Sequence, residues 1–282
     1  MLPYHIAILA NPNAGNHHGI QFAHWLEQQL LQKQIQHQVF TDNWPVHFTG
    51  FSDIWLIGGD GTINYFINQH PDCSLPLVLY KGGTGNDFSC HLYGKRSNKQ
   101  IFELVLKAEP GTVDAAKVNG KLYINCLGIG FDGEVLQSMG SIRFMGGHLG
   151  YLVAVIKTMF SFKEPFLKVI APGFSKQGHF LLAMITNSPK AGGGFHISPG
   201  ASVSDGKLDM VLSNNLSVIK RFRFLPVIEK GKHYSLPFIT HLQDTRFEIH
   251  AAEELAVQMD GELFYAKDLL VEVIPGKFLF RY

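Results

Sequence analysis

The sequence has few cysteines, almost no net charge and no long apolar run. Its 282 residues include three cysteines, Cys73, Cys90 and Cys126, and no CxxC pair. This disfavours a disulfide framework or a zinc site and favours a reducing, cytoplasmic location. The net charge of +1 gives no reason to expect a nucleic-acid partner.

Targeting signals and familiar ligand motifs are also missing. The N-terminus MLPYHIAILANPNAG has neither the basic region nor the apolar core of a secretory signal, and no window approaches the ~18 consecutive apolar residues of a transmembrane helix. The fourteen histidines show no HExxH-like spacing, and the phosphate-binding pattern GxxxxGK[ST] does not occur. We therefore expect a soluble protein that can still touch the inner face of a membrane.

The residues that are present predict more than one domain. Hydrophobic residues make up 46% and charged residues 17%, which is typical of a globular chain with a sizeable core. Up to about residue 115 strand-like and helix-like patterns alternate, and repeated βα units predict a parallel sheet covered by helices on both faces. Strands are expected at 5–10, 37–41, 53–58 and 75–80, and helices at 20–33, after residue 60 and at 99–108.

After about residue 112 the pattern becomes mostly antiparallel β. An Asn-Gly pair at 119–120 predicts a hairpin. Further strands are expected at 166–171, 180–187, 206–213, 246–251, 255–260 and 268–274, with helices only near 149–162 and 217–230. We therefore predict an α/β domain at 1–115, onto which the tail at about 270–282 packs back, and a β-rich domain at 116–269, with a cleft between them.

One glycine string is excluded as a dinucleotide site. GIGFDG, residues 128–133, matches GxGxxG and follows a predicted strand. A dinucleotide fold also needs an acid about 20 residues later to hold the ribose. Between Val135 and Lys163 there is no Asp or Glu, so this interpretation fails.

Two other glycine loops predict a phosphate site. GGDGT at 58–62 joins a strand to a helix, and KGGTGNDF at 81–88 follows the next strand in the same way. Glycines let the backbone approach a ligand, and the first amides of a helix attract phosphate oxygens. Asp60 would repel phosphate unless Mg²⁺ lies between them; the alternative is a tight turn in which Asp60 caps a helix. Because the carboxyl ends of parallel strands share one sheet edge, NPNAG at 11–15 is expected beside both loops.

NPNAG, GGDGTIN and GGTGNDF, in this order and spacing, resemble the diacylglycerol kinase catalytic domain family, which includes bacterial lipid kinases and sphingosine kinases. The similarity continues through INCLGIGFD (124–132), GGGFHISPGASVSDGKLDMV (192–211) and MDGE (259–262), nearly the whole chain. It implies an NAD kinase-like α/β nucleotide domain, a β-sandwich-like lipid-substrate domain and an active site between them. The implied reaction transfers the γ-phosphate of ATP to a lipid hydroxyl, with diacylglycerol or a related lipid as substrate.

The resemblance also implies roles for individual residues. ATP and its Mg²⁺ would be contacted by Asn11, Thr41, Gly58, Gly59, Asp60, Gly61, Thr62, Asn64, Gly83, Thr84, Gly85 and Asn86. Glu262 would be the general base and Asp60 a second catalytic residue, with Asp87 adding a carboxylate to the metal. A separate structural Mg²⁺ would be held by the Asp205 side chain and by the carbonyls of Ser202 and Lys207. Plain Asp-Gly turns are the alternative at 205–206 and 260–261, although a hairpin tip can also deliver a carboxylate into a cleft.

One departure from the family pattern keeps other functions open. Tyr65 stands where the family usually has Glu, which is compatible with a catalytically weak, nucleotide-binding regulatory protein. A kinase of a soluble acceptor, such as NAD, is the other alternative. The stretches 149–162 and 217–234 are candidates for peripheral membrane contact. The alternative for 149–162 is a helix packed between the domains, and the alternative for 217–234 is a solvated helix face. A homodimer is compatible with the sequence.

Overall fold

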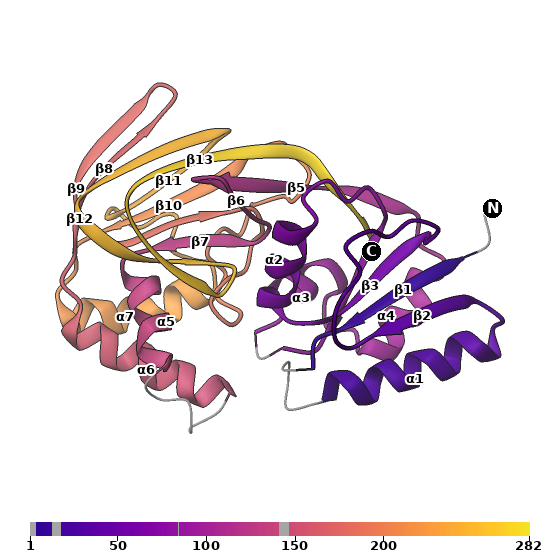
Figure 1. Cartoon of the computed structure of the whole chain (residues 1–282). Coiled ribbons are helices and arrows are strands. Elements are labelled where there is room, and N and C mark those ends of the chain that lie inside the picture. Colours follow the sequence, from indigo (N-terminus) through magenta and orange to yellow (C-terminus); the bar gives the residue numbers. More distant parts are fainter. Residues whose placement is uncertain (1–3, 13–17, 84, 141–146) are drawn as a thin grey trace. The chain divides into compact units, whose positions relative to one another are not determined.

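The computed structural model describes residues 4–12, 18–83, 85–140 and 147–282 (Figure 1). The chain divides into unit 1, residues 1–113 and 276–282, and unit 2, residues 114–275. It passes from one unit to the other twice, once within β5 (Pro110–Val118) and once within β13 (Glu262–Arg281). Unit 1 is therefore built from two pieces that are far apart in the sequence.

Unit 1 contains a parallel sheet whose strands alternate with helices (Figure 1). Its elements are β1 (His5–Ala10), α1 (His18–Gln32), β2 (Gln36–Phe40), β3 (Asp53–Gly58), α2 (Asp60–Gln69), β4 (Leu77–Lys81), α3 (Asp87–Tyr93) and α4 (Asn98–Val105). The strand order is β2-β1-β3-β4-β13, in which β13 joins β4 in parallel through Phe280 and Leu77. The predicted parallel α/β architecture is confirmed, and β1 and β3 occupy the predicted residues.

The central strands of unit 1 are apolar because they are buried throughout. Every residue of β3 is buried, as are the last five residues of β1, which is the pattern of a parallel sheet covered on both faces. Aromatic rings pack between the strands and α4. Trp55 of β3 lies edge-on to Tyr80 of β4 and to Phe102 of α4, with ring centroids 5.6 and 6.0 Å apart. This packing fixes the strand ends from which the glycine loops leave.

The C-terminal residues complete unit 1. The guanidinium of Arg281 pairs with the carboxylate of Asp53, which is fully buried in β3, and also donates to the carbonyl of Ala108 at 2.7 Å. The hydroxyl of Tyr93 donates to the carbonyl of Arg281 at 2.9 Å. A carboxylate buried this deeply needs such a partner, so the last strand compensates a charge in the middle of the sheet.

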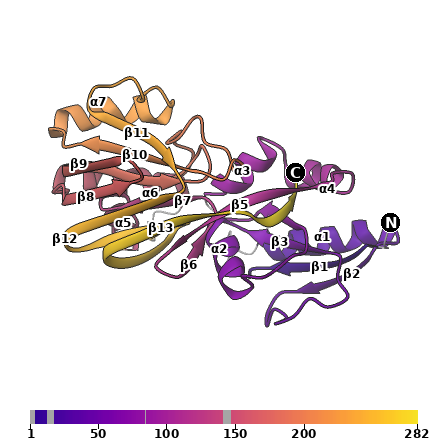
Figure 2. The same ribbon diagram turned by 90° about the horizontal axis from the view of Figure 1, so that it is seen from above.

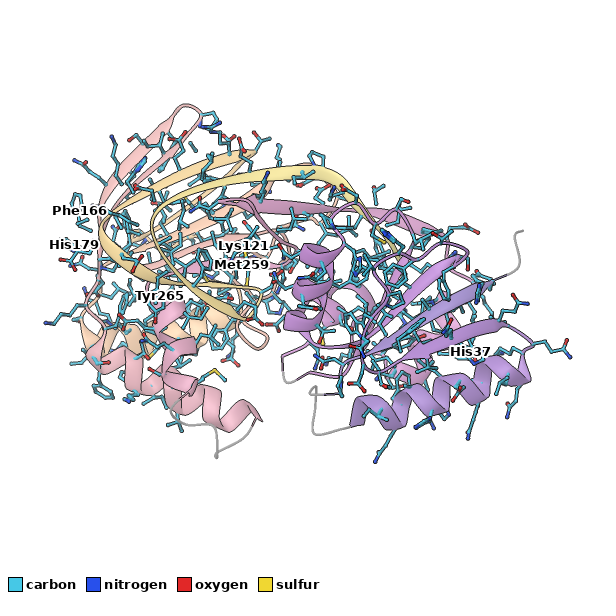
Figure 3. The ribbon with its side chains drawn as sticks, viewed as in Figure 1. His37, Lys121, Phe166, His179, Met259 and Tyr265 are labelled. Carbon is cyan, nitrogen blue, oxygen red and sulfur yellow. The ribbon has the colours of Figure 1, made fainter. Side chains whose placement is uncertain are left out.

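Unit 2 is mainly antiparallel β (Figure 2). Its elements, besides β5 and β13, are β6 (Lys121–Tyr123), β7 (Cys126–Ile129), α5 (Phe131–Gly140), α6 (Gly147–Ser161), β8 (Phe166–Ala171), β9 (Phe174–Thr186), β10 (Leu208–Asn214), α7 (Val218–Glu229), β11 (Ile239–Asp244) and β12 (Arg246–Met259). The strands follow the order β11-β10-β9-β7-β12-β13; β8 pairs with β9 and β12, and β5 with β6 and β13. Figure 3 shows one cross-strand pair of β8 and β9, Phe166 beside His179, with ring centroids 5.5 Å apart.

The second half of the central strand β9, residues 180–186, is buried on both faces. Its side chains alternate, so that Ala183 and Ile185 enter one apolar core while Leu182 and Met184 enter another. The first core is shared among the strands, and the second lies against α7. β9 therefore separates a sandwich-like strand core from a helix-covered side.

Several elements of unit 2 differ from the sequence-based expectation. The Asn119-Gly120 hairpin is confirmed between β5 and β6, with φ of 47° and 92° at the two turn residues. The expected strands 246–251 and 255–260 form one strand, β12, with a bulge between His250 and Leu255. The expectation of only two helices here was wrong, because α5 begins at Phe131, inside the glycine string that was considered as a loop.

Candidate active site

The sheet of unit 1 brings the first loop and α2 together. Asn11 follows β1, and its side-chain amide donates to the hydroxyl of Thr62 on α2 at 3.0 Å, while its backbone amide donates to Ile57 of β3 at 3.1 Å. Thr41 follows the last residue of β2, at the same edge of the sheet, and is half-buried. Parallel strands place all of these residues at their carboxyl ends.

The two glycine loops interlock backbone to backbone. A Cβ on Gly83 would lie 2.5 Å from the Cα of Gly59, and a Cβ on Gly59 would lie 2.9 Å from the Cα of Gly83. Gly58 meets Thr62 equally closely, since a Cβ on Gly58 would lie 2.2 Å from the threonine hydroxyl oxygen. Any side chain at these positions would force the loops apart, so glycine is required here for close approach.

Asp60 is the first residue of α2, yet it caps another helix. Its two carboxylate oxygens accept hydrogen bonds from the backbone amides of Asp87 and Phe88, at 3.0 and 3.1 Å, in the first turn of α3. Burial raises the pKa of Asp60, while these backbone hydrogen bonds lower it. A negative charge at a helix start is favourable, and the carboxylate links the first glycine loop to the second.

The second loop is held by its own asparagine. Asn86 adopts the left-handed conformation, φ 56°, and its side chain bonds both the amide and the carbonyl of Gly83, at 2.9 and 2.6 Å. Gly85 lies against Asp60, since a Cβ there would be 3.0 Å from the carboxylate. Asp87 is buried at the start of α3, and Thr84 lies outside the described residues. Asn86 thus shapes the loop rather than presenting its amide freely.

The N-terminus of α2 fits a phosphate group. Its N-cap is Gly59, which makes no side-chain capping bond. Gly61 lies within that turn, and Asn64, one turn further on, is buried. Backbone amides at a helix start attract phosphate oxygens, and the interlocked glycines leave no side chains in the way. Tyr65 points elsewhere: it is 57% exposed and contacts Trp44 edge-on at 5.8 Å.

In unit 2, the predicted base Glu262 follows a tight hairpin turn. Asp260 and Gly261 have φ of 48° and 88° and connect β12 to β13, with Met259 paired to Glu262. Two-residue turns with both central φ values positive are the favoured hairpin type. Glu262 itself is exposed. The turn and the presentation of a carboxylate therefore occur together, as expected for a hairpin tip.

Asp260, by contrast, is a structural anchor. It is 1% exposed and its carboxylate accepts three backbone hydrogen bonds, from Ile124 at 2.8 Å and from Asn125 and Cys126 at 2.9 Å each. The same segment, 124–126, is also held by Asn187, whose amide donates to the carbonyl of Ile124 at 2.8 Å. No pattern in the sequence indicated this role, because the partners lie more than 130 positions away from Asp260.

The predicted structural cation position is a turn between strands. The carboxylate of Asp205 accepts from the amide of Lys207 at 3.0 Å, and the hydroxyl of Ser202 accepts from Ser204 at 3.4 Å. Gly206 donates to the carboxylate of Asp114 at 2.7 Å. Among the described residues, no group of three or more His, Cys, Asp or Glu side chains is arranged to hold a metal. A cation here would depend on backbone carbonyls, as the resemblance implies.

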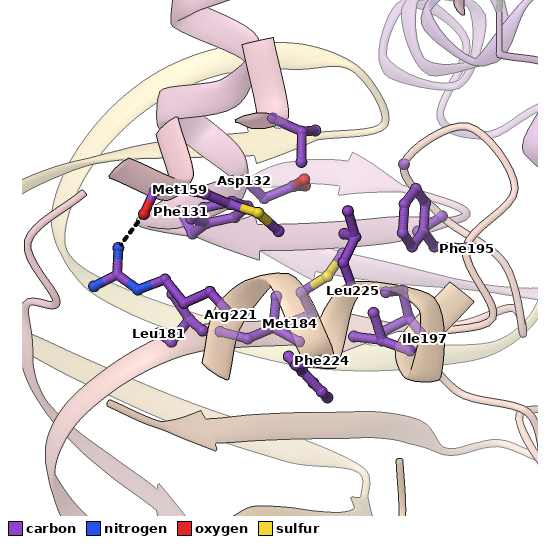
Figure 4. A pocket seen from close by; sticks show the side chains of 15 residues that line it. Phe131, Asp132, Met159, Leu181, Met184, Phe195, Ile197, Arg221, Phe224 and Leu225 are labelled. Atoms are coloured by element: carbon purple, nitrogen blue, oxygen red, sulfur yellow. Dashed lines mark hydrogen bonds between the residues drawn. The ribbon is translucent and has the colours of Figure 1, made fainter. Parts of the chain in front are cut away.

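An apolar pocket opens beside the helices of unit 2 (Figure 4). All of its lining residues except Asp132 and Arg221 are apolar or glycine: Phe131, Val155, Met159, Leu181, Leu182, Met184, Ala191, Gly192, Phe195, Ile197, Phe224, Leu225 and Ile228. They come from α5, α6, β9, α7 and the segment after β9. Pockets of this composition suit apolar ligands whose few polar atoms meet a small number of placed groups.

The two charged residues of this pocket differ. Arg221 is engaged, since its guanidinium pairs with Glu164 at 2.6 Å and donates to the carbonyls of Leu216, Met159 and Phe162. Arg221 is buried and joins α6 to α7, so it does not belong to the exposed basic residues of 217–234. Asp132 was missed: desolvation raises its pKa to about 6, against a hydrogen bond from Gln258 that lowers it. Its only sequence signal was that it is the acid inside the glycine string at 128–133.

Comparison with known proteins agrees with this geometry. Residues 5–118 match the diacylglycerol kinase catalytic domain, and residues 125–280, more than half of the chain, match the YegS C-terminal NAD kinase beta sandwich-like domain. The chain belongs to the diacylglycerol kinase catalytic domain family. Among the described residues of this family member, no helix has the length and apolar content to cross a membrane.

Curated relatives resemble this chain in sequence, and solved structures resemble it in fold. A Staphylococcus aureus (strain JH9) protein named as a candidate lipid kinase is 28% identical over 234 residues, 79% of this chain and 74% of that protein. A candidate diacylglycerol kinase from Bacillus anthracis superposes with a TM-score of 0.80 at 23% identity, covering 100% of this chain and 98% of that one. An Archaeoglobus fulgidus NAD kinase solved with ATP gives 0.55 at 13% identity, covering 98% and 93%. The structural likenesses confirm the predicted NAD kinase-like fold.

Proposed function

We propose that this diacylglycerol kinase family member is an ATP-dependent lipid kinase that transfers the γ-phosphate to a hydroxyl of diacylglycerol or a related lipid. One observation carries the proposal: a single chain combines interlocked glycine loops in unit 1 with an apolar pocket in unit 2. A soluble acceptor such as NAD would need polar partners along its length. The pocket wall offers Asp132 as its ionisable group besides the engaged Arg221.

The nucleotide would bind to unit 1. The amides at the start of α2 would hold its phosphates, with Asn11, Thr41 and the Gly83–Asn86 loop at the same sheet edge. Mg²⁺ would neutralise phosphate charge, and the residues present fit it through the carboxylates of Asp60 and Asp87. Both oxygens of Asp60 already accept backbone amides, so its orientation is fixed before any ion binds. We propose a second, structural cation at Asp205 and the neighbouring carbonyls.

Glu262 would accept the proton of the lipid hydroxyl. Phosphoryl transfer depends mainly on positioning and charge neutralisation, with a base to orient the acceptor. The hairpin turn presents the Glu262 carboxylate at the surface, whereas the carboxylate of the neighbouring Asp260 accepts hydrogen bonds from backbone amides. The base is therefore assigned to Glu262 rather than to Asp260.

A transfer assay tests the proposal directly. Purified protein with labelled ATP and Mg²⁺ is given dioctanoylglycerol, phosphatidylglycerol or sphingosine in detergent micelles, or NAD without micelles. We expect label on a lipid and none on NAD. In Leu225→Trp, which narrows the pocket, KM for the lipid should rise while KM for ATP is unchanged; Leu270→Trp, on an exposed part of β13, is the matched control. Label on NAD alone, or ATP binding without transfer, would refute the lipid assignment.

We further propose that the outer faces of α6 and α7 contact an anionic bilayer. Ile156, Phe160 and Ile219 are 39, 65 and 69% exposed, and Phe160 packs on Phe222 across the two helices at 5.1 Å. The exposed basic side chains on these helices and just beyond their ends are Lys157, Lys163, Lys220, Arg223 and Lys230, and the exposed acid there is Glu229. Apolar side chains ringed by cations suit a membrane surface. The inner faces of the same helices line the pocket.

Vesicle sedimentation tests this contact. The protein should bind phosphatidylglycerol vesicles more tightly than phosphatidylcholine vesicles, and added salt should weaken the difference. Phe160→Asp should abolish binding, whereas Leu31→Asp, on α1 and 63% exposed, should leave it unchanged. Equal binding by both variants would exclude this surface as the docking site.

A further inference from the structure

A buried glutamine lies between the pocket and the turn that carries Glu262. Gln258 is 6% exposed and stands two positions before Asp260 on β12; Figure 3 labels its neighbour Met259. Its amide oxygen accepts from the backbone amide of Gly261 at 2.9 Å, and its amide nitrogen donates to the sulfur of Cys126 at 3.1 Å. The two ends of one side-chain amide thus have different partners.

The third partner of Gln258 belongs to the pocket. Gln258 pairs across the sheet with Gly128, and the Asp132 carboxyl covers Gly128 on the same face, so the two side chains are neighbours. The contact with Gln258 lowers the pKa of Asp132, which lies in the first turn of α5 and faces the pocket in Figure 4. Gly128 leaves room for that carboxyl, because a Cβ at Gly128 would lie 2.3 Å from its oxygen. A ligand that displaces or protonates the Asp132 carboxyl would therefore act directly on the Gln258 amide.

The amide of Gly261 depends on Gln258. Asp260 fixes the turn to the 124–126 segment through its carboxylate, but the amide of Gly261 is bonded to the Gln258 side chain. Gly261 immediately precedes Glu262 and, with φ of 88°, can change conformation more easily than other residues. The Gln258 oxygen thus adds a side-chain contact to the residue next to Glu262, whose backbone is paired with Met259.

We propose that Gln258 is a positioning residue that couples Asp132 in the apolar pocket to the turn carrying Glu262. Seating of a lipid polar group at Asp132 shifts the Gln258 amide and, through Gly261, orients the base. This inference rests on the proposed lipid kinase function. A purely structural role, in which Gln258 only satisfies buried polar groups, makes different predictions.

Exchanging carboxyl and amide tests the coupling. Gln258→Glu keeps an oxygen for Gly261 but removes the donor to Asp132 and places two carboxyl groups together. We expect kcat to fall about tenfold, the rate cost of one misplaced hydrogen bond, with KM for ATP unchanged. The double variant Asp132→Asn with Gln258→Glu restores a hydrogen bond in the opposite direction and should recover most of kcat. Failure of the double variant to exceed Gln258→Glu overturns the coupling.

A readout without turnover separates this inference from the proposed function. The backbone amide signal of Gly261 is followed by NMR while dioctanoylglycerol is added in micelles. We expect it to shift in the wild type and to stay fixed in Gln258→Glu. No shift in the wild type, or equal shifts in both, overturns the coupling. A wild-type shift without any phosphate transfer to lipid leaves the coupling supported and refutes the kinase assignment alone.

Discussion

The Asp260 carboxylate offers a sharp test of how the hairpin is held. In Asp260→Asn the side chain keeps its shape, and asparagine tolerates the φ of 48°, so the backbone adds no strain. One of the three backbone amides then faces the side-chain NH₂ group of asparagine, which is a donor, instead of an acceptor oxygen. The other two amides still donate to an oxygen, but that oxygen is no longer charged. A hydrogen bond to a charged group contributes about 1.5–3 kcal/mol and a neutral one about 0.5–1.5.

Loss of one charged bond and weakening of two would cost about 3–5 kcal/mol, from which relief of the buried charge subtracts about 1 kcal/mol. We therefore expect the free energy of unfolding to fall by about 2–4 kcal/mol. Urea unfolding followed by circular dichroism measures it. The three tryptophans, Trp25, Trp44 and Trp55, all lie in unit 1, so their fluorescence reports that unit separately from the damaged one.

The matched control is Asp268→Asn, which alters a carboxylate that is 65% exposed and accepts from His250. A change within about 0.5 kcal/mol is expected there, as for most surface substitutions. If Asp260→Asn lowers stability by no more than this control, the three backbone contacts do not hold the turn, and the reasoning is refuted.

Three other substitutions probe the base, the glycine loops and the pocket acid. Glu262→Gln should lower kcat by about 10²–10⁴-fold with ATP affinity near wild type; a loss of ATP affinity with unchanged kcat at saturating ATP would instead place Glu262 in the nucleotide pocket. Gly83→Ala puts a methyl 2.5 Å from Gly59 and should cost about 1–3 kcal/mol of stability and weaken ATP binding in calorimetry. Gly200→Ala, with nothing within 4 Å and no positive φ, is the matched control and should change neither. Because burial raises the pKa of Asp132 from 3.8 to about 6, the folded state holds that proton more tightly, so its contribution to stability falls as pH rises from about 4 to about 6; Asp132→Asn should flatten this part of the stability profile, and an unchanged profile would contradict the shift.

Much of the fold could be predicted because its strands carry local signals. β1 and β3 are continuous apolar runs that end at glycine or turn residues, and the Asn119-Gly120 pair marks its hairpin. β11 was missed because only two of its six residues, Ile239 and Leu242, are apolar and none of the six is buried. α3 was missed for a different reason: its first turn depends on the carboxylate of Asp60, 27 positions earlier.

The candidate site, like the fold, could be predicted only in part from the sequence. Motifs indicated Gly59 and Gly83, but not that the two glycines touch, which depends on adjacent strands. Sequence reasoning left Asp60 as a metal ligand or as a helix cap; the structure shows that it caps α3, and its metal role stays a prediction. Asp132 and Gln258 carry no motif by which their contact could be found, because it forms only when β12 lies beside α5.

The two-piece construction of unit 1 has a consequence for biosynthesis. A ribosome finishes residues 1–113 early, but the strand that covers β4, residues 276–281, is made only after residues 114–275. Until then the edge of β4 is open, and the buried Asp53 lacks the guanidinium of Arg281. The nascent sheet is therefore an unfinished template for pairing with other chains while unit 2 is translated. Holding chaperones should engage this chain during that interval and release it once residues 276–281 have left the exit tunnel and paired with β4.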